Sequence, residues 1–338
     1  MDKRMKAAVI GCGLISGNHL KALEQTAHAR IYAVCDRDRD KAVKTAGEYA
    51  VPVVYDDYRR LLADPEIDTV HICTPHHLHC RMAVDSLEAG KHVLCEKPMA
   101  LSAADAGLML AARDRSGKQL GICFQNRYNE SSRYLKDLAA SGRLGTLLGG
   151  RGQVTWNRRP DYYLDSPWRG RWSTEGGGVL INQAIHTFDL LQWLTGKVKT
   201  VEASISTKRL KGVIEVEDTA DVLMQGTDGE RILFYASNCY VKNAPVEIEI
   251  IGTGGSVRMV GNQVFAEIGE TTEHRDYSSG AVHGKDYWGS GHGLLIEDFY
   301  ECIRTGRPFP VSGEEAMATV ELLAAVYASG RSGQVTGL

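Results

Sequence analysis

Short apolar runs alternate with amphipathic stretches over residues 6–124, and this alternation constrains the fold more than any other feature. The runs are KAAVIG, RIYAVCD, TVHICTP, KHVLCEKP and QLGICF, and the stretches between them include NHLKALEQ and CRMAVDSLEAG. Continuous runs rich in Val and Ile, separated by helices, are typical of a parallel sheet that helices cover on both faces. We therefore predict a doubly wound α/β domain over residues 1–124, built from right-handed crossovers.

The pattern changes after about residue 125. A helical stretch, ESSRYLKDLAASG, and a strand-like stretch, LLGGRGQVTWN, lead into mostly alternating segments over residues 198–268. Turn signals at Thr227-Asp228-Gly229 and Gly254-Gly255 divide these segments into hairpins. We predict that residues 125–338 form an α+β domain with a large, mainly antiparallel, open sheet, and that two helices close the chain. One face of this sheet has no evident cover, which favours self-association.

Size and charge restrict the class of protein. A chain of 338 residues suits two domains, and 39 basic against 42 acidic side chains give a net charge of −3. We expect no nucleic-acid partner and no membrane attachment, because no apolar run approaches the roughly 20 residues that span a bilayer. The eight cysteines form no CxxC pair, which favours a reduced, cytoplasmic location. Those that fall near predicted strand ends are expected to be small buried apolar groups: Cys12, Cys35, Cys73, Cys95 and Cys123.

A glycine motif follows the first predicted strand and opens a helix: Gly11-x-Gly13-x-x-Ser16. In a dinucleotide site the first glycine makes a tight turn, and the second lets the backbone approach the pyrophosphate at the helix N-terminus. Ser16 stands where Gly or Ala is usual, but it is also small. The alternative is an α/β domain with a glycine turn and no nucleotide.

An acid at the end of the second strand strengthens the dinucleotide interpretation. Asp36 lies about 20 residues beyond the glycine motif, where a carboxylate accepts hydrogen bonds from the adenosine ribose. The same charge would repel a 2′-phosphate, so we predict NAD rather than NADP, although Arg37 beside it leaves some use of NADP open. The cofactor residues expected from this part of the chain are Gly11, Gly13, Leu14, Ile15, Asp36 and Arg37.

Within the segment HICTPHHLHC, four histidines and the second of two cysteines lie close together and resemble a metal-binding cluster: His71, His76, His77, His79 and Cys80. We expect no metal there, because His71 lies inside a predicted strand and no second group of ligands completes a shell. Thr74-Pro75 at a strand's carboxyl end is better interpreted as a turn near the nicotinamide half of the cofactor.

The segment INQAIHTFD, residues 181–189, carries polar residues on a strongly apolar helical pattern. Asn182, His186 and Asp189 are spaced i, i+4 and i+7, which places all three on one face of a helix. A buried hydrogen-bond network and a polar face toward a cleft both account for this spacing.

Three motifs in order, TPHHLH, CEKP and GGGVLINQAIHTFD, resemble those of the glucose-fructose oxidoreductase, inositol dehydrogenase and MocA family, written Gfo/Idh/MocA. The resemblance spans essentially the whole chain. It implies an N-terminal Rossmann domain that binds NAD, and oxidation of a secondary ring hydroxyl of a sugar, cyclitol, anhydrosugar or sugar acid to a ketone. It also implies a homodimer or homotetramer formed through the C-terminal sheet.

The resemblance carries over residue by residue. The EKP motif falls on Glu96, Lys97 and Pro98, and its lysine reaches the nicotinamide ribose and the reacting hydroxyl. The DxxxHxxD helix motif falls on Asn182, His186 and Asp189, so here the first acid is an amide. The remaining positions implied at the cofactor or substrate are Thr74, Pro75, His76, where Asn is usual, His79, Asn126 and Arg127.

The amide affects the choice of base. Asn182 cannot accept the hydroxyl proton, although it can hydrogen-bond a substrate. We predict that His186 is the base and that Lys97 holds the developing alkoxide, with Lys97 itself as the alternative base. For Asp189 and Glu96 a structural role is the more plausible one.

The loop WNRRPDYYLDSPWRGRWSTEGGG mixes aromatic residues with arginines. Aromatic faces stack on sugar rings and guanidinium groups bind hydroxyls or carboxylates, although Asp161 and Asp165 can also pair with these arginines. We expect Tyr163, Trp168 and Arg169 to bind substrate, together with Asn182 and Arg127.

Two other functions fit the same motifs. The first is a redox-neutral glycosidase or lyase that oxidises a sugar transiently with tightly bound NAD. The second is a non-catalytic NAD-binding regulator, against which the presence of both Lys97 and His186 argues.

Overall fold

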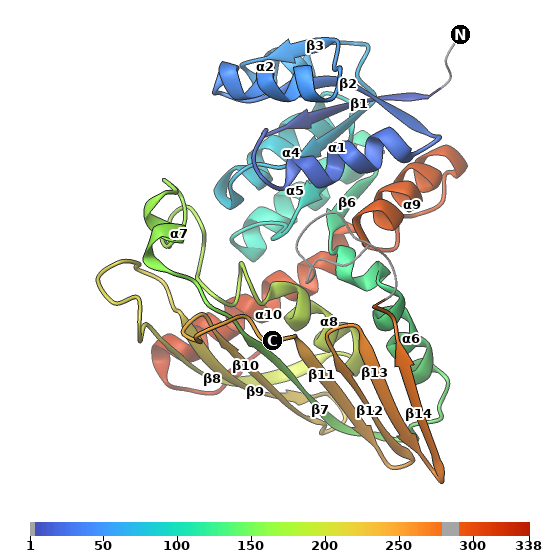
Figure 1. The fold of residues 1–338 in the computed structure, drawn as a ribbon, viewed down its shortest axis with the longest axis vertical. Helices are drawn as coiled ribbons and strands as arrows, with labels where there is room; N and C mark the ends of the chain where they lie inside the picture. Colours follow the sequence, from blue (N-terminus) through green and yellow to red (C-terminus); the bar gives the residue numbers. More distant parts are fainter. Residues whose placement is uncertain (1–3, 279–290) are drawn as a thin grey trace. The chain divides into compact units, whose positions relative to one another are not determined.

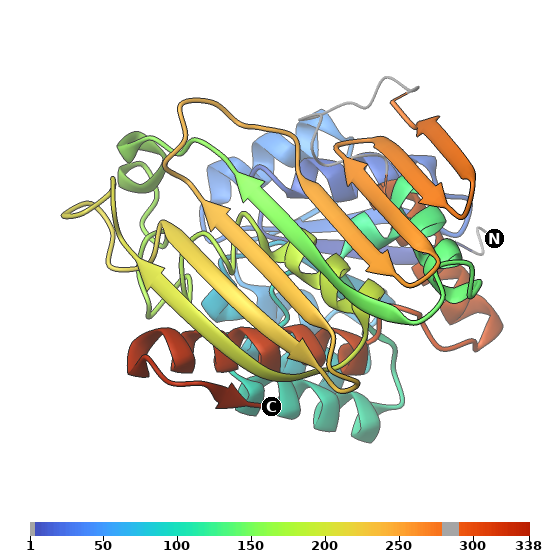
Figure 2. The ribbon, with the colours of Figure 1, turned by 90° about the horizontal axis from the view of Figure 1, so that it is seen from below.

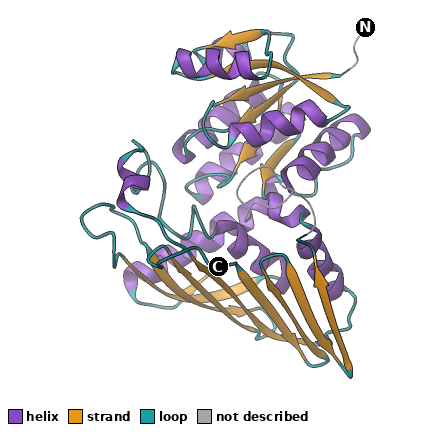
Figure 3. Cartoon of the chain, in the orientation of Figure 1, coloured by secondary structure: helices purple, strands orange, loops and turns teal. Residues whose placement is uncertain are grey.

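The computed structural model describes residues 4–278 and 291–338, which form two compact units. Of the described residues, the first unit contains 4–125 and 291–320, and the second contains 126–278 and 321–338. Figure 1 follows the chain from its N-terminus, and Figure 3 separates helices from strands.

A six-stranded sheet in the order β3-β2-β1-β4-β5-β6 forms the centre of the first unit. All of its strand pairs are parallel, which confirms the predicted doubly wound domain. The short strand β3 was not among the five predicted runs, because only three of its residues pair and none is fully buried. The strands are β1 (Met5–Ile10), β2 (Ala29–Cys35), β3 (Val53–Tyr55), β4 (Thr69–Ile72), β5 (His92–Glu96) and β6 (Leu120–Cys123).

Helices connect these strands, and local sequence explains several of their ends. Asp38 caps one helix by accepting the Lys41 N–H, and Ser102 caps another by accepting the Asp105 N–H. Gly117, with φ at 66°, ends the second of these helices in the left-handed conformation. The helices are α1 (Ser16–Gln25), α2 (Arg39–Glu48), α3 (Tyr58–Leu62), α4 (His79–Glu88) and α5 (Ala103–Ser116), with a 3₁₀ turn at His76–Leu78.

Residues 291–320 belong to the first unit, whereas the sequence-based boundary had assigned them to the second domain. Helix α9 (Gly291–Thr305) packs against α1 and buries Leu295, Ile296 and Phe299. The ring of Phe309 fills the space that a side chain at Gly121 would need. The apolar residues of this C-terminal segment contact parts of the chain that lie more than 170 positions earlier in sequence. Local periodicity does not reveal contacts between such distant segments.

The second unit contains a nine-stranded sheet in the order β14-β13-β12-β11-β7-β10-β9-β8-β15. Only β7 and β10 pair in parallel, so the predicted, mainly antiparallel sheet is confirmed, including the β9–β10 and β11–β12 hairpins. The strands are β7 (Leu147–Thr155), β8 (Val198–Ser206), β9 (Thr219–Gly226), β10 (Arg231–Ser237), β11 (Glu247–Gly252), β12 (Gly255–Val260), β13 (Gln263–Ile268), β14 (Thr271–Asp276) and β15 (Thr336–Gly337).

One face of this sheet is covered by helix α8 (Ile185–Thr195), which packs on β7 and β11. The ring of Phe188 from α8 meets Phe234 of β10 at a centroid distance of 5.0 Å. Figure 2 looks onto the opposite face, where no helix of the described residues lies in front of the strands. The other helices are α6 (Glu130–Ala140), α7 (Pro160–Leu164) and α10 (Gly313–Ser332), the last of which contributes residues to both units.

Among the described residues, no helix combines the length and the apolar character needed to cross a membrane.

Candidate active site

The two glycines of the N-terminal motif are required for different structural reasons. Gly11 has φ at +94°, and a Cβ there would lie 2.5 Å from the carbonyl oxygen of Cys73, at the end of the neighbouring strand β4. A Cβ at Gly13 would meet nothing within 4 Å. The backbone at Gly13 is therefore open to a ligand, and no side chain caps the N-terminus of α1 just beyond it. This cradle fits the pyrophosphate of a dinucleotide.

The carboxylate of Asp36 is anchored at the end of β2. It accepts the backbone N–H of Cys12 at 2.9 Å and that of Asp38 at 2.9 Å. Asp36 is half-buried, whereas Arg37 and Leu14 are exposed. The glycine loop and this acid thus lie together, as a ribose-binding carboxylate requires.

The TPHHLH segment lies at the carboxyl end of β4, beside the end of β5. His79 is fully buried, and its Nδ1 and Nε2 lie 2.7 Å from the Pro98 carbonyl and 2.9 Å from the Thr74 carbonyl. His79 therefore ties the TP turn to the EKP turn. His76 is also buried, whereas Thr74 and Pro75 are half-buried.

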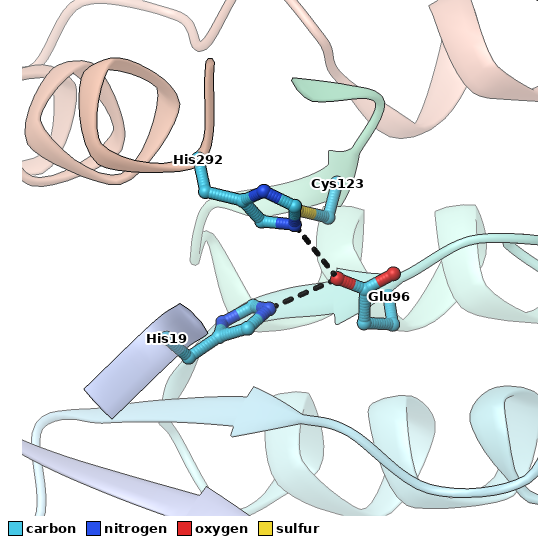
Figure 4. A group of neighbouring side chains, drawn as sticks. All are labelled: His19, Glu96, Cys123 and His292. Carbon is cyan, nitrogen blue, oxygen red and sulfur yellow. Dashed lines mark hydrogen bonds and ion pairs between the residues drawn. The ribbon is translucent and has the colours of Figure 1, made fainter. Parts of the chain in front are cut away.

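His71 points away from that segment, inside β4, and bonds His19 and Tyr300. A different set of metal-ligating side chain types lies close together in the described part of the chain: His19, Glu96, Cys123 and His292 (Figure 4). Within it, His19 Nε2 is hydrogen-bonded to Glu96 Oε1 at 3.0 Å.

Lys97 follows directly after β5 and is half-buried, and its backbone N–H donates to Glu96 Oε2 at 3.2 Å. Burial acts to raise the pKa of Glu96, but the hydrogen bonds and charges of His19 and His292 outweigh it and hold that pKa well below its usual range. The five cysteines expected to be small buried groups are buried, except Cys12, which is half-buried.

In the second unit, Arg127 and Asp189 form a buried bidentate ion pair. Arg127 Nε and Nη2 lie 2.8 and 2.7 Å from the two carboxylate oxygens, and the guanidinium also lies 5.3 Å from the centroid of the Trp193 ring. This arrangement gives Asp189 the structural role that was considered the more plausible one. It also commits the guanidinium of Arg127, predicted at the substrate, to a contact within the protein.

Helix α8 begins at Ile185, four residues later than the helical pattern of residues 181–189 suggested. Asn182 lies in the preceding turn, where its N–H donates to the Gly178 carbonyl. The expectation that Asn182, His186 and Asp189 share one helical face is therefore wrong for Asn182. His186 lies in the first turn of α8 and is half-buried.

Two buried glutamates, which the sequence did not reveal, hold the turn before α8. Glu175 is fully buried and accepts from the Gly170 N–H and from the Asn182 amide. Glu217 accepts the N–H groups of Gly178 and Leu180 at 2.9 and 3.1 Å, and the hydroxyl of Tyr327 at 3.1 Å. Burial raises the pKa of Glu217 to about 7.

Two glycines of the triplet at residues 176–178 indicate that other groups pack closely against this turn. A Cβ at Gly178 would overlap the Glu217 backbone carbonyl, and one at Gly177 would overlap the Tyr327 hydroxyl. These two positions therefore require glycine because polar groups approach the backbone closely.

The aromatic and arginine-rich loop divides into buried and accessible members. Tyr163 packs with Leu210, Ile214 and Val216, and its hydroxyl accepts from the Asn238 amide at 3.0 Å. Tyr163 is thus a core residue rather than an open sugar-stacking surface. Arg169, half-buried, lies over the ring of Tyr162 at 4.2 Å and that of Trp168 at 5.1 Å.

Comparison with known proteins agrees with this geometry. Residues 5–124 match the oxidoreductase family with an NAD-binding Rossmann fold, and residues 132–258 match the GFO/IDH/MocA C-terminal domain. The chain belongs to the Gfo/Idh/MocA family. It is an oxidoreductase whose first unit is an NAD-binding Rossmann domain.

Relatives in the Gfo/Idh/MocA family match over nearly the whole chain. D-apiose dehydrogenase of Paraburkholderia graminis is 27% identical, covering 99% of this chain and 90% of the relative. Inositol 2-dehydrogenase of Salmonella typhimurium is 26% identical, covering 94% and 91%. The WlbA dehydrogenase of Chromobacterium violaceum, solved with NADH and UDP-GlcNAcA, is 33% identical with a TM-score of 0.89, covering 100% and 97%.

Proposed function

We propose that the protein oxidises a secondary ring hydroxyl of a sugar, cyclitol, anhydrosugar or sugar acid to a ketone, with NAD as the hydride acceptor. The open cradle at Gly13, with Lys97 in the same unit, carries the proposal, because together they provide a cofactor site and a cation for the reacting oxygen. The whole-length match to named dehydrogenases supports the same chemistry.

Each residue has one role in this proposal. Bound NAD supplies the acceptor for the hydride. Lys97 binds the hydroxyl oxygen and stabilises the negative charge that develops on it, and His186 takes up the proton. Asn182 hydrogen-bonds a substrate hydroxyl but takes no proton. Lys97 as the base remains the alternative assignment.

We propose an acidic sugar as the first substrate to test. The WlbA dehydrogenases from Bordetella pertussis and Chromobacterium violaceum, 29% and 33% identical to this chain, were both solved with UDP-GlcNAcA. Arg169 is stacked between Tyr162 and Trp168, and a guanidinium whose rotamer is already fixed loses less entropy when it binds a carboxylate or phosphate.

The test is a substrate panel with NAD, followed by NADH absorbance and by mass spectrometry of the product. The panel contains UDP-GlcNAcA, free uronates, inositol, levoglucosan and apiose. We expect at least one member to form NADH and a ketone in equal amounts, with the highest kcat/KM for an acidic sugar. A panel in which the neutral sugars all exceed the acidic ones would contradict the acidic-substrate proposal.

A redox-neutral glycosidase or lyase is the second candidate, in which the hydride returns to a cofactor that stays bound. In that case the substrate is converted while NADH does not accumulate. Denaturing the purified protein should then release one molecule of NAD per chain. Stoichiometric NADH from an added sugar excludes it.

A further inference from the structure

A buried carboxylate lies directly before Lys97, and its surroundings are unusual. Glu96 is 4% exposed, and His19 from α1 and His292 from α9 approach the same oxygen, Oε1, at 3.0 and 3.7 Å (Figure 4). The thiol of Cys123 lies beside them, and all four side chains belong to the first unit. The proposed function uses Lys97 but gives no role to these groups.

His19 continues into a series of buried hydrogen bonds. Its Nδ1 lies 2.8 Å from His71 Nδ1, and His71 Nε2 lies 2.8 Å from the Tyr300 hydroxyl. The Tyr300 hydroxyl in turn lies 2.8 Å from Thr69 Oγ1. His19, His71 and Tyr300 are all fully buried, so bulk solvent does not reach them and their hydrogen bonds are made to one another and to neighbouring side chains.

The charge on Glu96 sets the direction of its hydrogen bond with His19. An ionised carboxylate only accepts, so His19 must donate from Nε2. His19 Nδ1 and His71 Nδ1 lie 2.8 Å apart, so one of these two rings donates to the other.

His71 and Tyr300 continue the series as neutral groups. Burial lowers the pKa of His71 well below its usual value, so the His71 ring is neutral and carries one proton. Burial raises the pKa of Tyr300, which therefore keeps its proton, and its hydroxyl is hydrogen-bonded to both His71 Nε2 and Thr69 Oγ1. Buried hydrogen bonds thus join all of these side chains to Glu96.

The carboxylate of Glu96 also contacts the backbone of Lys97, directly after β5. Glu96 Oε2 accepts the backbone N–H of Lys97 at 3.2 Å. His19 lies in the first turn of α1, the helix that follows the glycine loop, so it connects the cofactor-binding helix with the end of β5.

We propose that His19 is a positioning residue: through the buried carboxylate of Glu96, it fixes the backbone of Lys97 relative to the cofactor-binding helix. The proposal rests on the role of Lys97 in the proposed function. Its physical basis is that a displacement of about 1 Å at a reacting group lowers rates by about 10²-fold.

Three variants of the full-length protein test this proposal. His19→Leu removes the donor to Glu96 and should lower kcat by at least about 10-fold, with the KM for the sugar changed much less. His19→Gln places an amide N–H near the position of Nε2 and should restore most of kcat. Thr69→Val breaks the far end of the same series, 231 positions from Tyr300 in sequence, and serves as the matched control, which should lose stability but keep kcat.

A double-mutant cycle separates positioning from a merely structural role. If His19 acts through Glu96, the loss in kcat from His19→Leu with Glu96→Gln is no larger than the greater of the two single losses. Losses that multiply would overturn the proposal. A His19→Leu variant that stays folded by circular dichroism and keeps kcat within about twofold would overturn it as well.

A second measurement does not depend on activity, so it stands even if the proposed function fails. Nitrogen NMR of histidine-labelled protein should show a proton on His19 Nε2 and a neutral His71 ring, with the His19 signals assigned from the His19→Leu variant. A His19 ring without a proton on Nε2 would overturn the proposal. Stoichiometric zinc in the purified protein would overturn it too, because a metal ion would take the Nε2 lone pair of His19.

Discussion

At the scale of single residues, the candidate site depends on polar groups that are buried and held by several partners. Arg127 and Asp189 bind each other in a bidentate pair, and His79 bridges two backbone carbonyls. Such groups stabilise the loops that carry the reactive side chains, because a buried polar group left without a partner costs about 1–3 kcal/mol. Lys97 and His186, to which the proposed function assigns the chemistry, are by contrast only half-buried.

Lys97→Ala and His186→Ala should each lower kcat by roughly 10²-fold, the scale of a positioned acid–base group. NADH affinity of the His186→Ala variant should stay within about twofold of the unaltered protein, since His186 is assigned only to the sugar. Steady-state kinetics over a range of pH, with NADH fluorescence titration, measure both effects. Near-normal kcat for His186→Ala at every pH would assign the base to Lys97.

Glu217 should make stability depend on pH. Its pKa rises from 4.5 to about 7 on folding, so its contribution to the free energy of unfolding is complete below about pH 4.5 and is lost as the pH rises through 7. At about 1.4 kcal/mol per pH unit this amounts to about 3 kcal/mol. Urea unfolding at about pH 5 and about pH 8 should show this loss in the unaltered protein and a smaller one in Glu217→Gln. Equal losses in both would assign the dependence to other groups.

At the scale of elements, the ends of β1, β2, β4 and β5 in the first unit are fastened to one another. Gly11 lies against the end of β4, Asp36 directly after β2 holds the glycine loop, and His79 joins the turns after β4 and β5. In the second unit, Glu217 and Tyr327 fasten the turn before α8. A parallel sheet collects its carboxyl ends at one edge, so these links order the cofactor site as a whole.

The two glycines of the motif should respond differently to alanine. Gly11→Ala should lower stability by about 1–3 kcal/mol or more, because its φ is +94° and the new Cβ would contact the Cys73 carbonyl. Gly13→Ala should melt at nearly the same temperature but bind NADH at least about 10-fold more weakly, because its Cβ would enter the cradle. Thermal melts and NADH titration of both variants measure this contrast. Unchanged NADH affinity in Gly13→Ala would contradict the assignment of the cradle.

Asp36 should select between cofactors. Asp36→Ala removes both the charge and the acceptor for the Cys12 N–H, whereas Asp36→Asn keeps an acceptor and removes only the charge. Both substitutions should weaken the binding of NAD by about 1–3 kcal/mol and strengthen the binding of NADP relative to that of NAD. The glycine loop should be better preserved in Asp36→Asn than in Asp36→Ala. Ratios of kcat/KM for NAD and NADP provide the measurement. Equal use of the two cofactors by the unaltered protein would refute the role of Asp36.

At the scale of the whole molecule, the open face of the nine-stranded sheet is the surface best suited to a second copy. One cross-strand row on this face runs through Phe265, Arg258, Glu249, Arg151 and Leu233 in register. Phe265 is 39% exposed and Leu233 is 55% exposed, while Arg151 and Glu249 form an ion pair. Apolar and charged groups in one row suit a two-fold interface, in which each patch meets its own copy.

We predict a homodimer or homotetramer through this face. Leu233→Glu should shift the protein toward the 37.0 kDa monomer, because four charges introduced into a tetramer, or two into a dimer, would lie in the interface. Leu108→Glu on α5, where Leu108 is 58% exposed in the first unit, is the matched control. Light scattering after size exclusion measures both variants. A monomeric unaltered protein, or equal effects of the two substitutions, would contradict the prediction.

The sequence determined those features of the protein that are local or periodic. The Val- and Ile-rich runs between helical stretches sufficed to predict the parallel sheet. The turn signals at Gly229 and Gly254 sufficed to predict two hairpins. Both features depend on residues that are neighbours in sequence. The glycine spacing and Asp36 indicated the cofactor, since the strand and the loop that follows it carry that site together.

Only the tertiary structure decided which polar residues meet. Arg127 with Asp189, Glu217 with Tyr327, and His19 with His71 and Glu96 are pairs far apart in sequence, so neither spacing nor propensity relates them. The turn before α8 also depends on a distant residue, because Glu217 accepts the N–H groups of Gly178 and Leu180 ahead of the helix start at Ile185. Long-range packing and the hydrogen bonding of buried groups, rather than local preference, thus fixed the geometry around Lys97 and His186 within each unit.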